Sequence, residues 1–307
     1  VAIVNEVRAT KNGHKVLEVE DEEDRCAVLI LKDSAPMQEN IIPDEVIGIV
    51  GKTSRKGDMV VMEELIRPDL PLRGGMERSD STSSVAFLSD IHVGSNTFLE
   101  RQWHNMVHWL KTEGKDEIQY VVVPGDCVDG IGIFPGQEEE LLIDDIFQQY
   151  EALNDLFKSL PDGIKLVVMP GNHDAVRPAE PQPTFSQQIT DMFDSQVQFV
   201  GNPCYLEIEG RKILAYHGRS MDDWMSAVQT LSYSNPLEAM KEMLRRRHMA
   251  PIYGGKTPIA PEKEDYMVIE EVPDIFVTGH VHGAGISEYR GVKIICASTW
   301  QSQTAFQ

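Results

Sequence analysis

Five short clusters of aspartate, asparagine and histidine could perform chemistry in this sequence, and most of them directly follow an apolar run. Oxygen and nitrogen donors of these types bind divalent metal ions in proteins. The candidate ligands are Asp90, His92, Asp126, Asn172, His217, His280 and His282. One such pair alone is weak evidence, but the repeated placement predicts a site for two metal ions that share a bridging carboxylate and assist a hydrolysis.

The clusters require elements that bring them to one place. The apolar segments that precede them span residues 85–88, 120–123, 164–169, 204–216 and 274–277. We read these segments as strands, with the fourth as a hairpin, and expect helices at 141–160 and 222–248 between them. Strands that alternate with helices predict an α/β domain whose ligands gather at one sheet edge. Glycines before Asp126, Asn172 and His280 would let the backbone turn sharply there.

The N-terminal part has a different pattern. Residues 1–73 hold β-rich runs at 1–4, 16–19, 27–31, 46–50 and 59–62. Five short strands predict a small closed barrel of OB type, with an SH3-like barrel or a small sandwich as alternatives. The segment has 10 Lys and Arg against 15 Asp and Glu and no aromatic residue, which favours docking over binding of single strands. Residues 74–84 are a linker by composition, and 85–307 form the second domain.

Composition restricts the partners. The 307-residue chain has a net charge of −21, so a polyanionic substrate would need metal ions or a basic partner to be held. No apolar run approaches the roughly 18 residues of a membrane helix. We expect a cytoplasmic protein with no membrane contact. The first residue is Val1, and the last strand-like run ends close to Gln307, so we expect a fragment of a longer protein.

The order of the clusters resembles the calcineurin-like metallophosphoesterases, whose motifs run D-x-H, G-D, G-N-H-[D/E], a lone H, and G-H-x-H. The resemblance implies a β-sandwich flanked by helices after the barrel. It assigns one metal to Asp90, His92, Asp126 and His282, and the other to Asp126, Asn172, His217 and His280. It also implies that His173 protonates the leaving oxygen and that Asp174 orients His173.

Three longer stretches, 125–137, 171–183 and 250–261, look like the small subunits of archaeal family D DNA polymerases. No metal ligand is missing here, whereas the related B-subunits of eukaryotic replicative polymerases have lost ligands. The resemblance therefore implies a 3′–5′ proofreading exonuclease in DNA replication. It also implies a heterodimer with a large catalytic subunit, DNA with a 3′ end as substrate, and a sliding clamp reached through the holoenzyme.

Several alternatives remain open. Four imidazoles favour Mn²⁺ over Mg²⁺, with Fe or Zn as further candidates. Arg177 and Arg219 could hold substrate phosphates or form surface ion pairs. The basic run 245–248 fits a solvated helix end better than a contact with DNA or a partner. The same site could serve another dimetal phosphoesterase, acting on phosphomonoesters or cyclic nucleotides, or be a remnant in a non-catalytic scaffold subunit.

Overall fold

The computed structural model describes residues 1–74 and 81–303. Its N-terminal part is a closed barrel in the order β1-β2-β3-β5-β4. The strands are β1 (Ala2–Ala9), β2 (Lys15–Glu20), β3 (Arg25–Ile30), β4 (Val46–Thr53) and β5 (Met59–Ile66). Strands β3 and β5 pair in parallel, and the other pairs are antiparallel. The expected closed barrel of five strands is confirmed, with Val4, Leu17 and Met62 among the residues that fill it.

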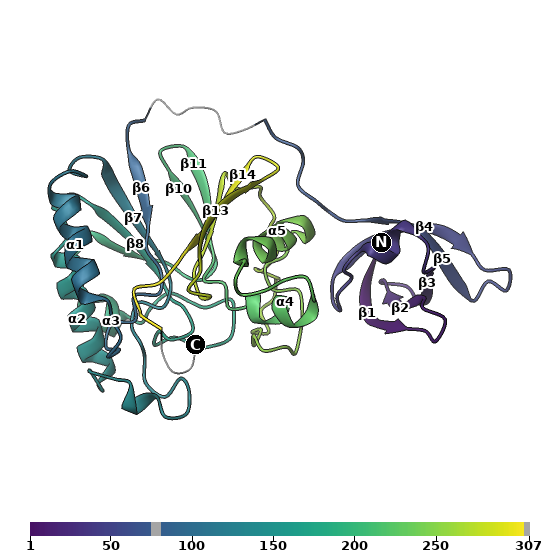
Figure 1. Cartoon of the computed structure of the whole chain (residues 1–307), viewed down its shortest axis with the longest axis horizontal. Coiled ribbons are helices and arrows are strands. Elements are labelled where there is room, and N and C mark those ends of the chain that lie inside the picture. The colour runs from purple at the N-terminus through teal and green to yellow at the C-terminus, as the bar shows by residue number, and fades with distance from the viewer. Residues whose placement is uncertain (75–80, 304–307) are drawn as a thin grey trace.

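Two sheets pack face to face in the second part (Figure 1). The first has four parallel strands, β6 (Ser84–Phe87), β7 (Ile118–Pro124), β8 (Lys165–Met169) and β9 (Val197–Phe199). The second has the order β10-β11-β12-β14-β13, with β10 (Cys204–Ile208), β11 (Arg211–Ala215), β12 (Ile275–Thr278), β13 (Ala284–Tyr289) and β14 (Val292–Ala297). Val122 and Val167 from one sheet meet Ile213 and Val277 from the other in a shared apolar cluster.

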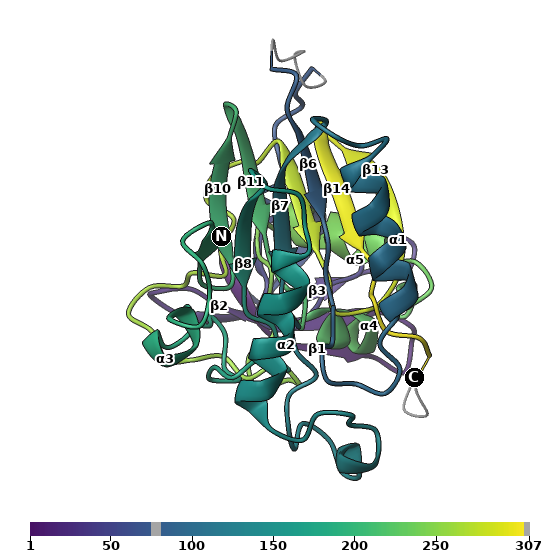
Figure 2. The ribbon, with the colours of Figure 1, turned by 90° about the vertical axis from the view of Figure 1, so that its left-hand side faces the viewer.

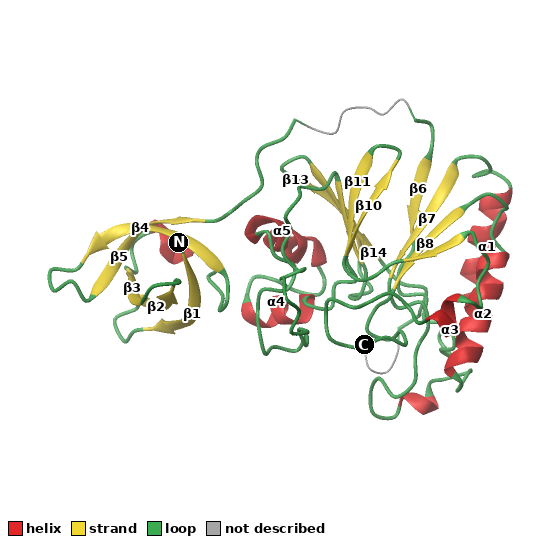
Figure 3. Ribbon diagram, turned by 180° about the vertical axis from the view of Figure 1, so that it is seen from behind, coloured by secondary structure: helices red, strands yellow, loops and turns green. Residues whose placement is uncertain are grey.

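Helices cover the outer faces of both sheets, as Figures 2 and 3 show. The first sheet carries α1 (Glu100–Lys111), α2 (Ile146–Lys158) and α3 (Gln187–Thr190), and the second carries α4 (Met221–Ala227) and α5 (Pro236–Arg246). The predicted mixed α/β class is confirmed. Two short 3₁₀ turns lie at Ala35–Gln38 and Gln137–Glu139. Among the described residues, no helix is both long and apolar enough to cross a membrane.

The expected helix boundaries need correction. Helix α2 begins at Ile146 rather than 141, because the Asp145 side chain accepts the backbone N–H groups of Phe147 and Gln148 and caps it there. The expected helix at 222–248 is two helices, and Pro236 occupies the first turn of the second. The predicted linker falls partly on residues 75–80, which lie outside the described residues.

A buried ion network joins the barrel to the sandwich. The Glu45 carboxylate accepts from Arg246 Nε on α5 at 2.5 Å and from Arg67 Nε at 3.3 Å, and all three side chains are at most 4% exposed. Two barrel-side apolar residues, Ile42 and Leu70, extend the core of the second sheet. The prediction of a solvated helix end at 245–248 was therefore wrong for Arg246.

This network predicts unequal roles for two adjacent arginines. We expect Arg246→Ala to lower the free energy of unfolding by about 3 kcal/mol, because it leaves the buried Glu45 carboxylate with one partner fewer. The matched variant Arg245→Ala removes a side chain that is 34% exposed and pairs with Glu39, and should cost at most about 1 kcal/mol. Urea unfolding measures both, and equal losses would show that the network does not hold the interface.

Candidate metal centre

The candidate ligands converge where the strands of both sheets end. Turns after β6 and β7 carry Asp90, His92 and Asp126, while turns after β11 and β12 carry His217, His280 and His282. The candidate ligand atoms form two groups in which all atoms lie within 4.8 Å of one another, namely Asp90, His92 and His282, and Asp126, His217 and His280. A third group of the same kind, His92, Asp129 and His173, shares His92 with the first. Asn172 joins the second group, since its Oδ1 accepts from His217 Nε2 at 3.0 Å. The structure thus brings all seven candidates together.

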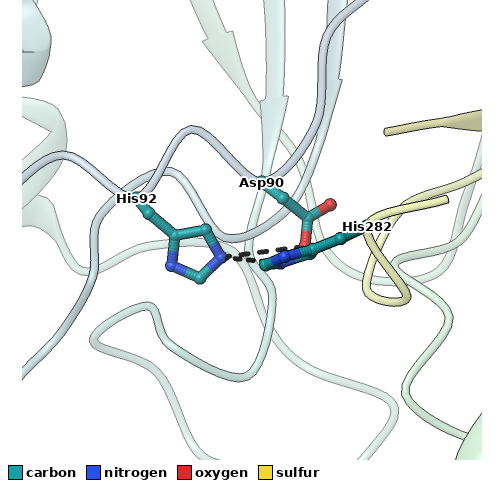
Figure 4. A group of neighbouring side chains, drawn as sticks. All are labelled: Asp90, His92 and His282. Carbon is teal, nitrogen blue, oxygen red and sulfur yellow. Dashed lines mark hydrogen bonds and ion pairs between the residues drawn. The ribbon is translucent and has the colours of Figure 1, made fainter. Parts of the chain in front are cut away.

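The first group has its donor atoms pointing at one another (Figure 4). His92 Nε2 lies 3.1 Å from His282 Nε2, and His282 Nε2 lies 3.3 Å from Asp90 Oδ1. Asp90 and His92 are buried, whereas His282 is partly exposed. Two imidazoles and a carboxylate in this arrangement offer three donors to one ion.

Asp126 lies between the two groups. Its Oδ2 is 3.3 Å from His217 Nε2 and 3.9 Å from His92 Nε2. The other oxygen, Oδ1, accepts from the backbone N–H of His173 at 2.8 Å. A carboxylate within reach of donors from both groups can be shared by two ions.

The turns that hold the ligands are strained. Asp90, His92, Asp126, His280 and His282 all have φ between 50° and 69°, a left-handed conformation that costs free energy for residues other than glycine. Such outliers persist where the surrounding structure fixes them, and they cluster at functional sites.

Glycine is required beside these turns. A Cβ on Gly279 would lie 1.9 Å from Ser89 Oγ and 2.3 Å from Asp90 Oδ2. One on Gly171 would lie 2.2 Å from Asp126 Oδ1. Both backbones therefore approach the carboxylates as closely as only glycine allows.

The electrostatics of the cluster suit a cation. Within the described part of the chain, the ion-pair partners of Asp90 and Asp126 are all histidines. Burial opposes ionisation of Asp126, but the neighbouring His217 and His173 outweigh it and hold the pKa of Asp126 well below its usual value. Burial lowers the pKa of His217, yet the Asp126 carboxylate raises it to about 10. Buried oxygen and nitrogen donors around two carboxylates are a donor set that fits divalent metal ions.

Outer partners orient the imidazoles, and sequence reasoning missed them. His92 Nδ1 donates to Asp129 Oδ1 at 2.9 Å, which leaves Nε2 to face the cluster. Gln137 and Gln301 donate to the same buried carboxylate. His280 Nε2 lies 3.2 Å from Asp222 Oδ2 on α4. Asp129 stands three residues after Asp126 and could have been found by that spacing, whereas Asp222 carries no comparable signal.

His173 lies beside the first group, with its ring edge-on to His92 at a centroid distance of 4.6 Å. Its Nδ1 donates to the backbone carbonyl of Asp129 at 2.7 Å. The predicted orienting role of Asp174 needs correction. Asp174 accepts instead from the backbone N–H groups of Cys127 and Gly171 and from the Tyr150 hydroxyl. It therefore ties the turns after β7 and β8 together.

The two candidate phosphate-binding arginines contact other parts of the chain. Arg177 donates to the Pro181 carbonyl and pairs with Glu262 at 2.5 Å. Arg219 donates from one nitrogen to the Pro178 carbonyl at 3.0 Å. The surface ion pair that we considered as the alternative is present for Arg177.

The outer partners predict that Asp129 supports metal binding without contacting the metal. Asp129→Asn removes the charge that orients His92 and places an amide N–H₂ against the Gln137 donor, so Mn²⁺ affinity should fall about 10- to 100-fold. Asp144→Asn, a change on the exposed part of the same connection, should leave affinity unchanged. Calorimetric titration measures both, and equal affinities in the two variants would contradict the orienting role.

Comparisons with known proteins show what the chain resembles. It is 46% identical over its whole length to the DNA polymerase II small subunit of Archaeoglobus fulgidus and 44% identical to that of Thermoplasma acidophilum. The chain spans 64% of the length of each of these relatives. A solved structure described as a novel archaeal phosphodiesterase covers 70% of this chain and 83% of its own, at 13% identity and a TM-score of 0.34, which is too low to support a conclusion.

The family comparison covers most of the sandwich. Residues 85–284 match the family described as the DNA polymerase alpha/epsilon B-subunit. That range includes every candidate ligand, from Asp90 after β6 to His282 after β12. From this match and the full-length similarity to the small subunits, the chain belongs to the DNA polymerase alpha/epsilon B-subunit family.

Proposed function

We propose that this chain is a metal-dependent 3′–5′ exonuclease that hydrolyses phosphodiester bonds at DNA 3′ ends as part of the small subunit of an archaeal replicative polymerase. The observation that carries the proposal is the pair of ligand groups around Asp126, with the His173 imidazole directly beside them. The relatives named as DNA polymerase II small subunits support the polymerase context.

Metal binding and proton donation would be carried out by different residues. Asp90, His92 and His282 would hold one ion, His217, His280 and Asn172 would hold the other, and Asp126 would be shared. When bound, two divalent ions neutralise phosphate charge and lower the pKa of water toward neutrality. His173, fixed through Nδ1 by the Asp129 carbonyl, would donate a proton from Nε2 to the leaving 3′ oxygen. The imidazole-rich donor set favours Mn²⁺, with Fe or Zn as alternatives.

The acidic chain needs help to hold DNA. Its net charge of −21 opposes binding of a polyanion over the general surface. We propose that a large catalytic subunit binds the DNA in a heterodimer with this chain. We also propose that a sliding clamp is reached only through the holoenzyme. Arg219, two residues after His217, is the better candidate for a phosphate contact, since Arg177 is engaged by Glu262.

We propose that the barrel is of OB type and serves for docking. Support comes from its strand order and from the parallel pairing of β3 with β5 that closes it. We divide the chain into a barrel at 1–73, a linker at 74–84 and a phosphoesterase domain of calcineurin-like type at 85–307, acting in the cytoplasm.

A direct assay tests the proposed activity. DNA labelled at its 5′ end should be shortened stepwise from the 3′ end in the presence of Mn²⁺, and EDTA should abolish the shortening. Turnover of p-nitrophenyl phosphate without any DNA shortening would instead indicate a phosphomonoesterase. Neither activity at saturating Mn²⁺ would indicate a scaffold subunit.

His173 should separate metal binding from catalysis. We expect His173→Ala to retain both ions and to lower the cleavage rate by about 10²- to 10⁴-fold, which is the usual contribution of a general acid. His104→Ala, which removes an exposed histidine of α1, should cleave at the wild-type rate. Metal content by mass spectrometry and single-turnover cleavage measure the two properties. Wild-type cleavage by His173→Ala would remove His173 from the mechanism.

A further inference from the structure

The connection between β7 and α2, which also carries Asp126 and Asp129, exposes two aliphatic side chains. Ile131 is 46% exposed and Ile133 is 39% exposed. Gly132 between them has φ of 72°, and no atom lies within 4 Å of the position that its Cβ would take. We call residues 131–133 the apolar tip. Two exposed isoleucines only two residues apart form a small apolar surface, and such surfaces can be contact sites.

Buried amide side chains hold the backbone on both sides of the tip. Gln137 Oε1 accepts from the N–H of Ile133 at 2.9 Å, and its Nε2 donates to the Asp129 carbonyl at 2.8 Å. Gln149 on α2 accepts from the N–H of Gly130 and donates to the carbonyl of the same residue. Both glutamines are fully buried. These hydrogen bonds fix the backbone of the tip in one conformation, which is typical of a preformed contact surface.

The tip begins next to the residues that would do the chemistry. Asp129 contacts His92 through its carboxylate and His173 through its carbonyl. Gly130 packs so closely on the backbone of His173 that an added Cβ would lie 2.3 Å from the His173 carbonyl oxygen. Ile131 is two residues after Asp129, which places their Cα atoms at most about 7.6 Å apart. The tip therefore begins two residues after Asp129, which contacts both His92 and His173.

Charge indicates which part of a substrate would lie there. The tip is uncharged, and Glu138, Glu139 and Glu140 lie further along the same connection, after four uncharged residues. Carboxylates repel phosphates, whereas a nucleobase is neutral and offers an apolar face. Aliphatic side chains pack against bases where DNA is unstacked.

We propose that Ile131 and Ile133 bind the terminal nucleobase of a DNA 3′ end and thereby make the site select unpaired ends. The inference rests on the proposed exonuclease function. A base can pack on the tip only after it leaves its partner, and a mismatched base leaves at the lowest cost in free energy. The tip would therefore favour mispaired ends because their terminal base separates more easily from its partner, and not because of the identity of the base.

The test compares Ile131→Ala/Ile133→Ala with the control Val50→Ala/Ile66→Ala, which removes two similarly exposed aliphatic side chains from the barrel. Three Mn²⁺-dependent rates are measured with the 307-residue chain: on a mismatched 3′ end, on a paired 3′ end, and on bis-p-nitrophenyl phosphate. We expect the tip variant to lose about tenfold on the mismatched end and to hydrolyse the small diester at the wild-type rate. The control should match the wild type on all three.

A measurement of DNA binding tests the inference independently of the cleavage rates. In Mn²⁺, with His173→Ala added to every variant to slow cleavage, single-stranded DNA with 2-aminopurine at its 3′ end should change its fluorescence on binding the chain with an intact tip and the control, but not on binding the tip variant. An unchanged ratio of mismatched to paired rates, together with an unchanged fluorescence signal in the tip variant, would overturn the inference and leave the exonuclease function standing.

Two further outcomes separate the remaining possibilities. If the wild type cleaves the small diester but no DNA, even with the large catalytic subunit added, the proposed exonuclease function is wrong, and the inference, which rests on it, is overturned as well. If the tip variant instead shifts a dimer to a monomer in sedimentation with cleavage and fluorescence unaltered, the tip joins two copies of the chain and the inference is wrong.

Discussion

The burial of two carboxylates side by side is the constraint on which the rest of this structure depends. Asp90 and Asp126 lie out of water, and their ion-pair partners among the described residues are histidines. Burying such charges is costly unless a cation compensates them. The left-handed turns at both residues add strain that the surrounding loops must hold. The unfavourable burial of charge and the backbone strain occur together at Asp90 and Asp126, as expected of a site that binds cations.

The position of the candidate metal centre explains why both sheets are needed to form it. Asp90, Asp126 and Asn172 follow strands of the parallel sheet, whereas His217, His280 and His282 follow strands of the second sheet. Each ligand group contains residues from both sheets. The metal centre can therefore form only when the two sheets are packed together. Arg246 and Glu45 join the barrel to α5 rather than to the turns that carry the candidate ligands.

Sequence reasoning found the candidate ligands because each one lies within a few residues of a strand end, so its position depends on local sequence. It missed Asp222 and Gln301 because they reach the site from α4 and from the segment after β14, and only tertiary packing brings them there. It misjudged Arg246 for a similar reason, since a basic helix end looks solvated until a second domain covers it. It also assigned Asp174 to His173, because adjacency in sequence does not fix where a side chain on a turn points.

The central claim is that one shared carboxylate joins two metal sites. Anomalous diffraction from crystals of the chain soaked in Mn²⁺ tests this most directly. We predict two peaks, one among Asp90, His92 and His282 and the other among Asp126, His217 and His280, with Asp126 contacting both ions. A single peak, a peak bound through other residues, or no anomalous signal at saturating Mn²⁺ would contradict it.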